Sequence, residues 1–263
     1  MGEVYVITSG KGGVGKTTTT ANIGTGLASH GKKVVLIDAD IGLRNLDVVL
    51  GLENRIVFDL VDVVEGSCRL KQALIRDKKF PSLSLLPTAQ HKDKNAVTPE
   101  QMRKLCAQLK EENDYVIIDC PAGIEQGFKN AVAGADKAIV VTTPEVSAIR
   151  DADRIIGLLQ ASELPPPMMI LNRIKIDMVK RGDMMTLEDV SDILAIDVLG
   201  IVPDDESIII STNRGEPSVT DEKSLAGQSF RDIVRRILGE SVPLMDLLED
   251  QKLIDKIINF FKR

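Results

Sequence analysis

The stretch from Gly10 to Thr18 reads G-K-G-G-V-G-K-T-T, and it follows a short apolar run at Val4–Thr8. Its first glycine together with Gly15, Lys16 and Thr17 fills the pattern G-x-x-x-x-G-K-[ST] of a phosphate-binding loop. Glycines let backbone N–H groups wrap a polyphosphate, and the following helix turns its electropositive N-terminus towards it. The stretch predicts a strand, a phosphate-binding loop and a helix in that order; a glycine-rich turn that binds nothing is the alternative.

The parts of this loop have different expected roles. Lys16 is expected to hold the β- and γ-phosphates of a nucleotide, and the Thr17 hydroxyl to bind Mg²⁺. Lys11 stands at the tip of the loop, where the generic pattern requires no lysine. The nucleotide-binding residues expected in the loop are Gly10, Lys11, Gly12, Gly13, Val14, Gly15, Lys16, Thr17 and Thr18.

Apolar runs rich in Val, Ile and Leu recur along the chain, and helix-like stretches lie between most of them. This alternation is typical of an α/β fold with a doubly wound, mostly parallel sheet and helices on both faces, here a P-loop NTPase fold. One helix start is marked by Thr98-Pro99-Glu100-Gln101, a capping box with proline in the first turn. The expected strands are Val4–Thr8, Lys33–Asp38, Leu83–Pro87, Tyr115–Asp119, Lys137–Thr142, Met168–Asn172 and Val198–Pro203.

Composition limits the class of protein. The length of 263 residues suits a single α/β domain, expected over residues 1–243, with a short linker near Gly239–Pro243 and a tail at 244–263. A net charge of −6 argues against a surface that coats nucleic acid. The three cysteines lack metal-ligand spacing, and no secretory leader or spanning segment is evident. The expected location is cytoplasmic.

Aspartates follow two of the buried strands. Asp38-Ala39-Asp40 ends one of them, and Asp119-Cys120-Pro121-Ala122-Gly123 ends another. Carboxylates at the carboxyl ends of parallel strands lie near the phosphate loop, where they can orient Mg²⁺ directly or through water. Thr17, Asp38 and Asp119 are therefore the candidate metal ligands, and Asp119 fits best; aspartates that only cap strand ends are the alternative.

The base-binding residues are predicted from two further strand ends. Asn172-Arg173 closes one strand and Pro203-Asp204 closes another, which brings amide and carboxylate groups to the place of a nucleobase edge. The stretch from Asn172 to Lys175 lacks the aspartate that guanine-specific loops need, so ATP is the expected substrate. A solvated loop is the alternative.

The octapeptide K-G-G-V-G-K-T-T, with D-x-D and D-C-P-A-G after later strands, resembles the deviant Walker A (ParA/MinD) family of ATPases. The resemblance implies that Lys11 reaches the nucleotide of a second subunit in an ATP-bound homodimer. It also implies that Asp40 positions the attacking water, that Asp38 assists the metal shell and that Asn172 contacts adenine. The catalytic residues would then be Lys11, Lys16 and Asp40, with Lys11 as a solvated surface lysine the alternative.

The last twelve residues differ in character from the rest of the chain. On a helical projection, one arc is apolar and the other carries Lys252, Lys262 and Arg263 among its polar residues. A basic amphipathic helix of this length can lie in the headgroup plane of an anionic membrane, although a terminal helix packed on the core would look similar. The predicted membrane-binding residues are Leu253, Ile254, Ile257, Ile258, Phe260 and Phe261.

Loop and tail together resemble the family branch that places the division site on the inner face of the cell membrane. That resemblance implies recruitment of the division inhibitor MinC and, in many bacteria, control by MinE. Asp151 and Asp153 match positions of partner contact, with a solvated acidic helix face as the alternative. Flagellar-number regulators and ParA-like DNA-partition ATPases remain alternative functions; the former would be expected to carry an added N-terminal segment.

Overall fold

The computed structural model describes residues 2–90, 92 and 96–245. Its centre is an eight-stranded sheet in the order β3-β4-β2-β5-β1-β6-β7-β8. Every neighbouring pair is parallel except β3 with β4. The sheet is therefore doubly wound from β1 outwards, as the sequence predicts.

The strands are β1 Glu3–Thr8, β2 Val34–Asp38, β3 Ile75–Arg76, β4 Leu83–Leu86, β5 Tyr115–Asp119, β6 Lys137–Thr142, β7 Met168–Ile174 and β8 Val198–Pro203. The α-helices are α1 Lys16–Ser29, α2 Leu46–Val49, α3 Leu60–Val64, α4 Leu70–Ala73, α5 Pro99–Glu112, α6 Gln126–Ala133, α7 Val146–Ala161, α8 Ile176–Arg181, α9 Leu187–Leu194, α10 Glu206–Asn213 and α11 Leu225–Ile237. Two 3₁₀ turns, η1 Glu53–Arg55 and η2 Ser218–Thr220, complete the set.

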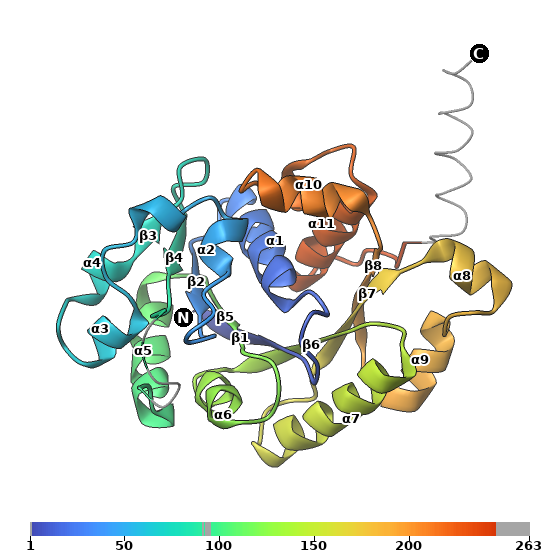
Figure 1. Ribbon diagram of the computed structural model, residues 1–263, viewed down its shortest axis with the longest axis horizontal. Coiled ribbons are helices and arrows are strands. Elements are labelled where there is room, and N and C mark those ends of the chain that lie inside the picture. Colours follow the sequence, from blue (N-terminus) through green and yellow to red (C-terminus); the bar gives the residue numbers. More distant parts are fainter. Residues whose placement is uncertain (1, 91, 93–95, 246–263) are drawn as a thin grey trace.

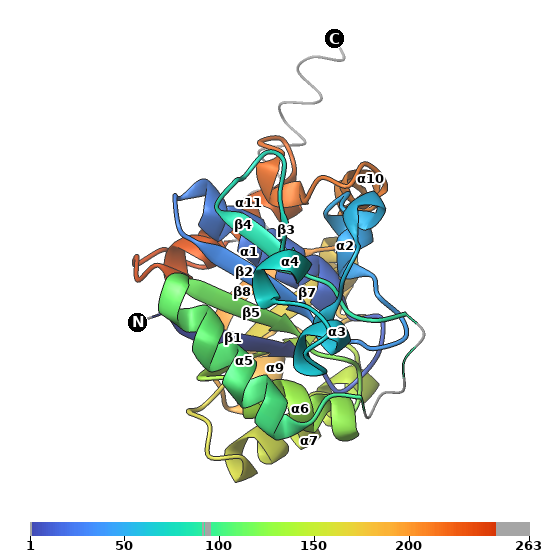
Figure 2. The same cartoon turned by 90° about the vertical axis from the view of Figure 1, so that its left-hand side faces the viewer.

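Helices cover both faces of the sheet (Figures 1 and 2). α1, α2 and α11 pack with one hydrophobic cluster, and α5, α6, α7 and α9 pack with the other. Residues of β1 alternate between the two: Val4 and Val6 belong to one cluster, Tyr5 and Ile7 to the other. A strand buried on both faces accounts for the continuous apolar run in the sequence.

The expected strands lie where the sequence places them, with ends that shift by up to two residues. The largest shift is in β7, which continues past Asn172 to Ile174 because an irregular register with β8 accommodates Arg173 at φ 56°. The expected capping box also forms, since the Thr98 side chain accepts a hydrogen bond from the Gln101 N–H. β3 is an edge strand of two residues that the sequence pattern does not reveal.

The predicted membrane-binding residues between Leu253 and Phe261 lie outside the described residues. Among the helices of the described ranges, none is both long enough and apolar enough to cross a bilayer. The chain up to Met245 thus forms the α/β framework that holds the candidate site.

Candidate nucleotide-binding site

The candidate site lies at the carboxyl ends of the central strands. β1 runs between β5 and β6, and the phosphate loop connects its end to α1. β2 pairs with β5 on the other side, with Asp38 opposite Asp119 in the register. The topology thus brings the loop and two predicted carboxylates to one edge of the sheet, the position where doubly wound folds bind ligands.

The first turn of α1 is open to an anion. Its N-cap, Gly15, has φ 101° and supplies no side-chain cap, and the first turn carries no acidic residue. The free N–H groups and the helix dipole therefore favour a phosphate there. A Cβ at Gly15 would lie 2.3 Å from Nδ2 of Asn172, so this position has room only for glycine.

Lys16 is the buried cation of the site. Its ammonium group donates a hydrogen bond of 2.9 Å to the Ser9 hydroxyl, and only 8% of the residue is exposed. Ser9 in turn donates to the carbonyl of Lys11 at 2.8 Å. Ser9 thus holds the Lys16 ammonium group against its own loop. A bound phosphate oxygen could replace this neutral acceptor and would make a stronger, charge-assisted hydrogen bond.

Two buried carboxylates stand beside this lysine. Asp38 accepts hydrogen bonds from the N–H groups of Asp40 at 3.0 Å and Leu46 at 3.3 Å. Asp119 accepts one from the Thr20 hydroxyl at 3.3 Å. Both aspartates are almost completely buried. Two ionisable carboxyl groups therefore lie in the same low-dielectric environment.

The electrostatics of this pair suit a cation. Burial raises the pKa of Asp38 well above its usual range, and the neighbouring Asp119 carboxylate raises it further. Burial also raises the pKa of Asp119, against the opposing effects of a Thr17 hydrogen bond and the Lys16 charge. Hard oxygen donors from Thr17, Asp38 and Asp119 match Mg²⁺, which usually takes its remaining ligands from water and phosphate. No group of three acidic, histidine or cysteine side chains in the described part of the chain could hold a metal by itself.

Asp40 lies between the loops that follow β2 and β5. Together with Ala39 and Ala122 it lines a cavity of about 30 Å³. That volume holds one or two water molecules. Gly123, at φ 92°, turns the loop after β5 past this cavity.

The predicted base-binding residues surround a larger pocket of about 400 Å³, lined by Gly15, Thr18, Asn172, Arg173 and Asp204 among others. This volume suits a nucleoside. The Asn172 amide is buried and donates to the carbonyl of Val14 at 2.7 Å, so it braces the phosphate loop. Its contact with adenine stays a prediction. Pro203 ends β8 behind this pocket and is not among its lining residues.

The two aspartates after β8 have different surroundings. Asp204 faces the pocket and lies 3.7 Å from the ammonium group of Lys175. Asp205 accepts hydrogen bonds from the N–H groups of Ser207 and Ala226, which lowers its pKa despite its burial. Asp205 therefore ties the starts of α10 and α11 together.

Lys11 points away from its own phosphate loop. Its ammonium group lies 3.5 Å from the Glu145 carboxylate and 3.3 Å from the Ser147 hydroxyl, both at the start of α7. The loop also touches α7 directly, because a Cβ at Gly10 would lie 2.3 Å from the carbonyl oxygen of Asp151. Asp151 is thus half-buried beside the loop, and Asp153 is exposed on the same helix.

Four of these contacting residues escaped the sequence analysis: Ser9, Thr20, Glu145 and Ser147. Ser9 and Thr20 flank the loop motif, so their position in the sequence could have suggested them. Glu145 and Ser147 carry no such signal, because the sheet order alone brings α7 beside the phosphate loop.

A phosphate loop between β1 and α1, with aspartates at the ends of neighbouring parallel strands, defines the class of P-loop nucleotide-binding proteins. A family model described as the CobQ/CobB/MinD/ParA nucleotide binding domain matches residues 5–219. The chain belongs to this MinD/ParA family of nucleotide-binding proteins.

Several relatives are similar over nearly the whole chain. The septum site-determining protein MinD of Bacillus subtilis (strain 168) is 61% identical over 264 aligned positions, which cover 99% of this chain and 98% of that protein. A chain of the MinC:MinD cell division protein complex of Aquifex aeolicus is 54% identical, with a TM-score of 0.87, and covers 92% of this chain and 98% of its own. MinD of Pyrococcus horikoshii OT3, complexed with Mg-ADP, is 30% identical, with a TM-score of 0.83 and coverages of 90% and 96%.

Proposed function

We propose that the chain is a Mg²⁺-dependent ATPase that pairs when it binds ATP, attaches to the inner face of the cell membrane through its C-terminal tail, and places the division site by recruiting an inhibitor. The observation that carries this proposal is the arrangement of four side chains. Lys16 and the Asp38–Asp119 pair are buried around the phosphate loop, whereas Lys11 is turned outwards.

The hydrolytic part of the proposal follows from these side chains. The loop N–H groups and Lys16 would hold the phosphates, and Thr17, Asp38 and Asp119 would hold Mg²⁺, which would supply charge neutralisation for the phosphates. Asp40 lines a cavity of the right size for a water and orients it for in-line attack. The related Pyrococcus protein, complexed with Mg-ADP, supports this choice of ligand and metal.

Pairing gives Lys11 its role. The side chain is exposed, and its present partners are two exposed groups on α7, so a second subunit can reach it. We infer that Lys11 crosses to the nucleotide of the partner in the ATP-bound homodimer. Turnover then depends on protein concentration.

Membrane attachment rests on the tail at residues 244–263. A single amphipathic tail of this length binds a bilayer weakly, because ordering about twelve residues costs about 1 kcal/mol or more for each. Two tails on one pair bind by avidity, about 10²–10⁴-fold more tightly than one. ATP-dependent pairing thereby becomes ATP-dependent attachment of the domain at residues 1–243.

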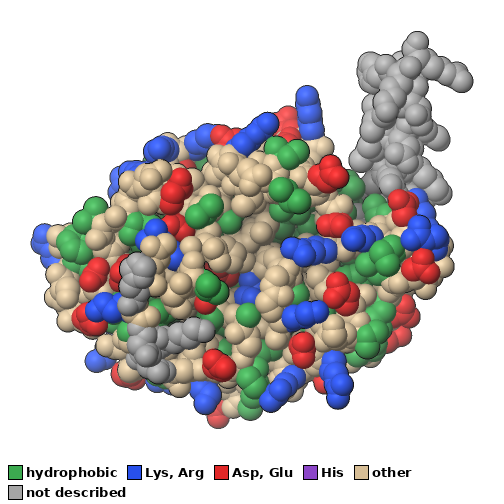
Figure 3. Space-filling model, in the orientation of Figure 1, with side chains coloured by type: hydrophobic (Ala, Val, Ile, Leu, Met, Phe, Trp, Pro, Cys, Tyr) green, Lys and Arg blue, Asp and Glu red, His purple; other side chains and the backbone are tan. Residues whose placement is uncertain are grey.

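Division-site placement is proposed from the relatives. The related Aquifex protein forms a complex with MinC, and the Bacillus relative is a septum site-determining protein. We infer that this chain recruits MinC through a surface that includes Asp151 and Asp153, and that MinE is a further partner where it is present. On the face drawn in Figure 3, Lys and Arg side chains are interspersed with Asp and Glu, which favours this function over DNA partition.

Sedimentation with vesicles tests the proposal. The full chain and a chain that ends at Leu244 are each mixed with anionic vesicles in Mg²⁺ with ATP or ADP. The full chain is expected in the pellet with ATP only, and the shortened chain in neither case. Equal sedimentation with ADP, or of the shortened chain, contradicts the proposal, and ATP-dependent binding to plain duplex DNA would instead favour a partition ATPase.

A further inference from the structure

The chain that follows α11 is hydrogen-bonded back to that helix. α11 ends with Arg235 and Arg236 in its final turn, and two hydrogen bonds close it: Gly239 N–H to the Arg236 carbonyl at 3.0 Å, and Glu240 N–H to the Arg235 carbonyl at 2.9 Å. This is the Schellman pattern of helix ends, with Gly239 at the left-handed position. The Glu240 carboxylate also pairs with Arg235 at 2.7 Å. Residues 239–240 therefore have a defined structure.

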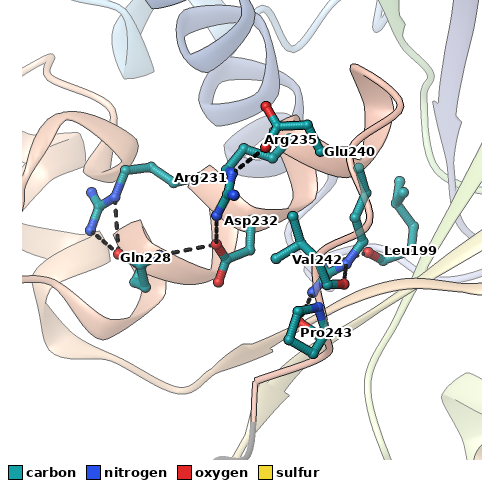
Figure 4. Close-up of polar contacts among 9 residues, drawn as sticks. Leu199, Gln228, Arg231, Asp232, Arg235, Glu240, Val242 and Pro243 are labelled. Atoms are coloured by element: carbon teal, nitrogen blue, oxygen red, sulfur yellow. Dashed lines mark hydrogen bonds and ion pairs between the residues drawn. The ribbon is translucent and has the colours of Figure 1, made fainter.

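The Arg236 guanidinium joins this segment to the sheet. It donates to three main-chain carbonyls: that of Val242 at 2.9 Å, that of Leu199 at 2.9 Å, and that of Pro243 (Figure 4). The planar fork of arginine suits several fixed acceptors, which an ammonium group does not match. We name Arg236 with these three carbonyls the tail clamp.

The tail clamp lies at an open edge of the sheet. Within the part of the chain that the structure describes, β8 is the last strand in the order and pairs only with β7. The guanidinium lies close to the β8 backbone, since a Cβ at Gly200 would be 3.4 Å from its Nη1 atom. Beyond the clamp, Met245 packs against the hydrophobic cluster that includes Ile174 and Ile201, and its sulfur also lies 3.7 Å from the hydroxyl of Ser229 on α11. The segment from Gly239 to Met245 is thus held against α11 and β8.

The sequence suggests a linker at Gly239–Pro243, but these residues are tied to α11 and β8 by the contacts above. The domain boundary after residue 243 stays a prediction. Residues 246–252 therefore separate the last described contact of this segment, at Met245, from the first predicted apolar anchor, Leu253.

We propose that Arg236 is a positioning residue for membrane attachment: the tail clamp fixes where each tail leaves the domain and keeps the stretch of sequence between the last anchored residue and Leu253 short. This inference rests on the proposed ATP-dependent attachment. A shorter tether raises the effective concentration of the second tail at the membrane once the first has bound. Release of the clamp, and of Met245 with it, would lengthen this stretch by about five residues, and for a flexible tether the −3/2 power dependence then predicts roughly a two-fold weaker attachment of the pair.

Arg236→Lys tests the tail clamp because it keeps the positive charge, and with it the electrostatic attraction to anionic lipid. The matched control is Arg231→Lys. Arg231 lies on the same helix, is also half-buried and also donates to main-chain carbonyls, those of Val219 and Asp221. Neither acceptor belongs to the segment from Gly239 to Met245.

Two readouts are compared for the full-length wild type and both variants. The first is the rate of cleavage after Glu240 by a glutamate-specific protease, which reports release of the segment without any membrane. The second is the affinity for vesicles of phosphatidylglycerol and phosphatidylcholine with ATP, at protein concentrations where light scattering shows equal pairing. For Arg236→Lys, cleavage is expected to be several-fold faster and vesicle affinity about two-fold lower, and Arg231→Lys should match the wild type in both.

The outcomes separate this inference from the proposed function. Unchanged cleavage in Arg236→Lys overturns the clamp itself. Faster cleavage with unchanged vesicle affinity overturns the positioning role, as does an equal loss of affinity in Arg231→Lys. If the wild type fails to bind vesicles in response to ATP, the proposed attachment fails and the positioning role fails with it, whereas the protease result still decides the clamp.

Discussion

The ammonium group of Lys11 lies 3.5 Å from the carboxylate of Glu145 within the same chain, and the two side chains are 45% and 59% exposed. An ion pair with this much exposure contributes about 0–1 kcal/mol. Lys11 can therefore leave Glu145 for a phosphate of a second subunit at little cost.

Lys11→Ala should separate pairing from folding. We expect the free energy of unfolding to change by less than about 0.5 kcal/mol, because the lost ion pair is exposed. ATP turnover should lose its dependence on protein concentration, since the residue that crosses to the partner is gone. Urea titration and phosphate release at several protein concentrations measure the two effects. Lys71→Ala, which removes another exposed ion pair at Glu112, is the control and should leave turnover unchanged.

Lys16→Ala should act on the nucleotide directly. The variant removes a buried charge-assisted contact to phosphate, which is worth about 1.5–3 kcal/mol, so ATP affinity should fall about 10–100-fold. Isothermal titration in Mg²⁺ measures this change, and an affinity equal to that of the wild type would show that Lys16 does not hold the phosphates.

Gly15→Ala should loosen the phosphate loop. An alanine methyl group at this position meets the Asn172 amide and must also adopt a left-handed φ, which costs about 1–2 kcal/mol. The Asn172 bond to the Val14 carbonyl would then break, and both stability and ATP affinity should fall. Gly66→Ala is the matched control, because its φ is also positive but no atom lies within 4 Å of the new methyl group. Its thermal unfolding should show only the backbone cost, with ATP affinity kept.

Asp40→Ala should separate binding from hydrolysis. The Asp38 carboxylate accepts from the main-chain N–H of Asp40, which the variant retains, so that support of a predicted metal ligand is kept. ATP binding and pairing should persist, while phosphate release falls by roughly 10²-fold or more. Light scattering with ATP and a phosphate-release assay test this pair of expectations, and unchanged turnover would remove Asp40 from the catalytic residues.

The Asp38–Asp119 pair predicts how stability depends on pH without nucleotide and metal. The pKa of each group is raised in the folded state, so the folded protein binds protons more tightly than the unfolded chain. The resulting stabilisation is complete below about pH 4, the unfolded pKa, and is lost as the pH rises through the raised folded values.

Asp119→Asn removes one member of the pair and keeps an oxygen that can accept from Thr20. The variant should be more stable than the wild type at pH 8, by about 1 kcal/mol or more, the equivalent of roughly one pKa unit. The advantage should shrink towards pH 5. Urea titrations in EDTA at several pH values measure it, and a pH-independent difference would mean that folding does not raise the pKa of Asp119.

Much of the fold could be predicted because strands buried on both faces leave continuous apolar runs. β5, β6 and β8 have the predicted bounds at both ends. β3, with two residues, is too short to produce a period, and the helices α2, α3 and α4 are only four or five residues long. Helices this short are marginal by themselves and depend on packing against neighbouring elements, such as that of α2 against α1 and α10.

The site could be predicted in its phosphate loop but not in its cross-contacts. Loop residues are consecutive, so the motif reports them together. The Lys11–Glu145 pair and the Arg236 clamp join residues that are far apart in sequence or held by main-chain carbonyls, and carbonyls leave no signature in a sequence. The folded arrangement of strands and helices brings these partners together.

The contact of Gly10 with Asp151 involves the carbonyl group and Cβ of Asp151, atoms that every residue except glycine possesses. The side chain at position 151 can therefore be exchanged without disturbing the loop that rests on it. Recognition of other proteins by α7 could diversify among descendants of this chain while the chemistry beneath it stayed under separate selection.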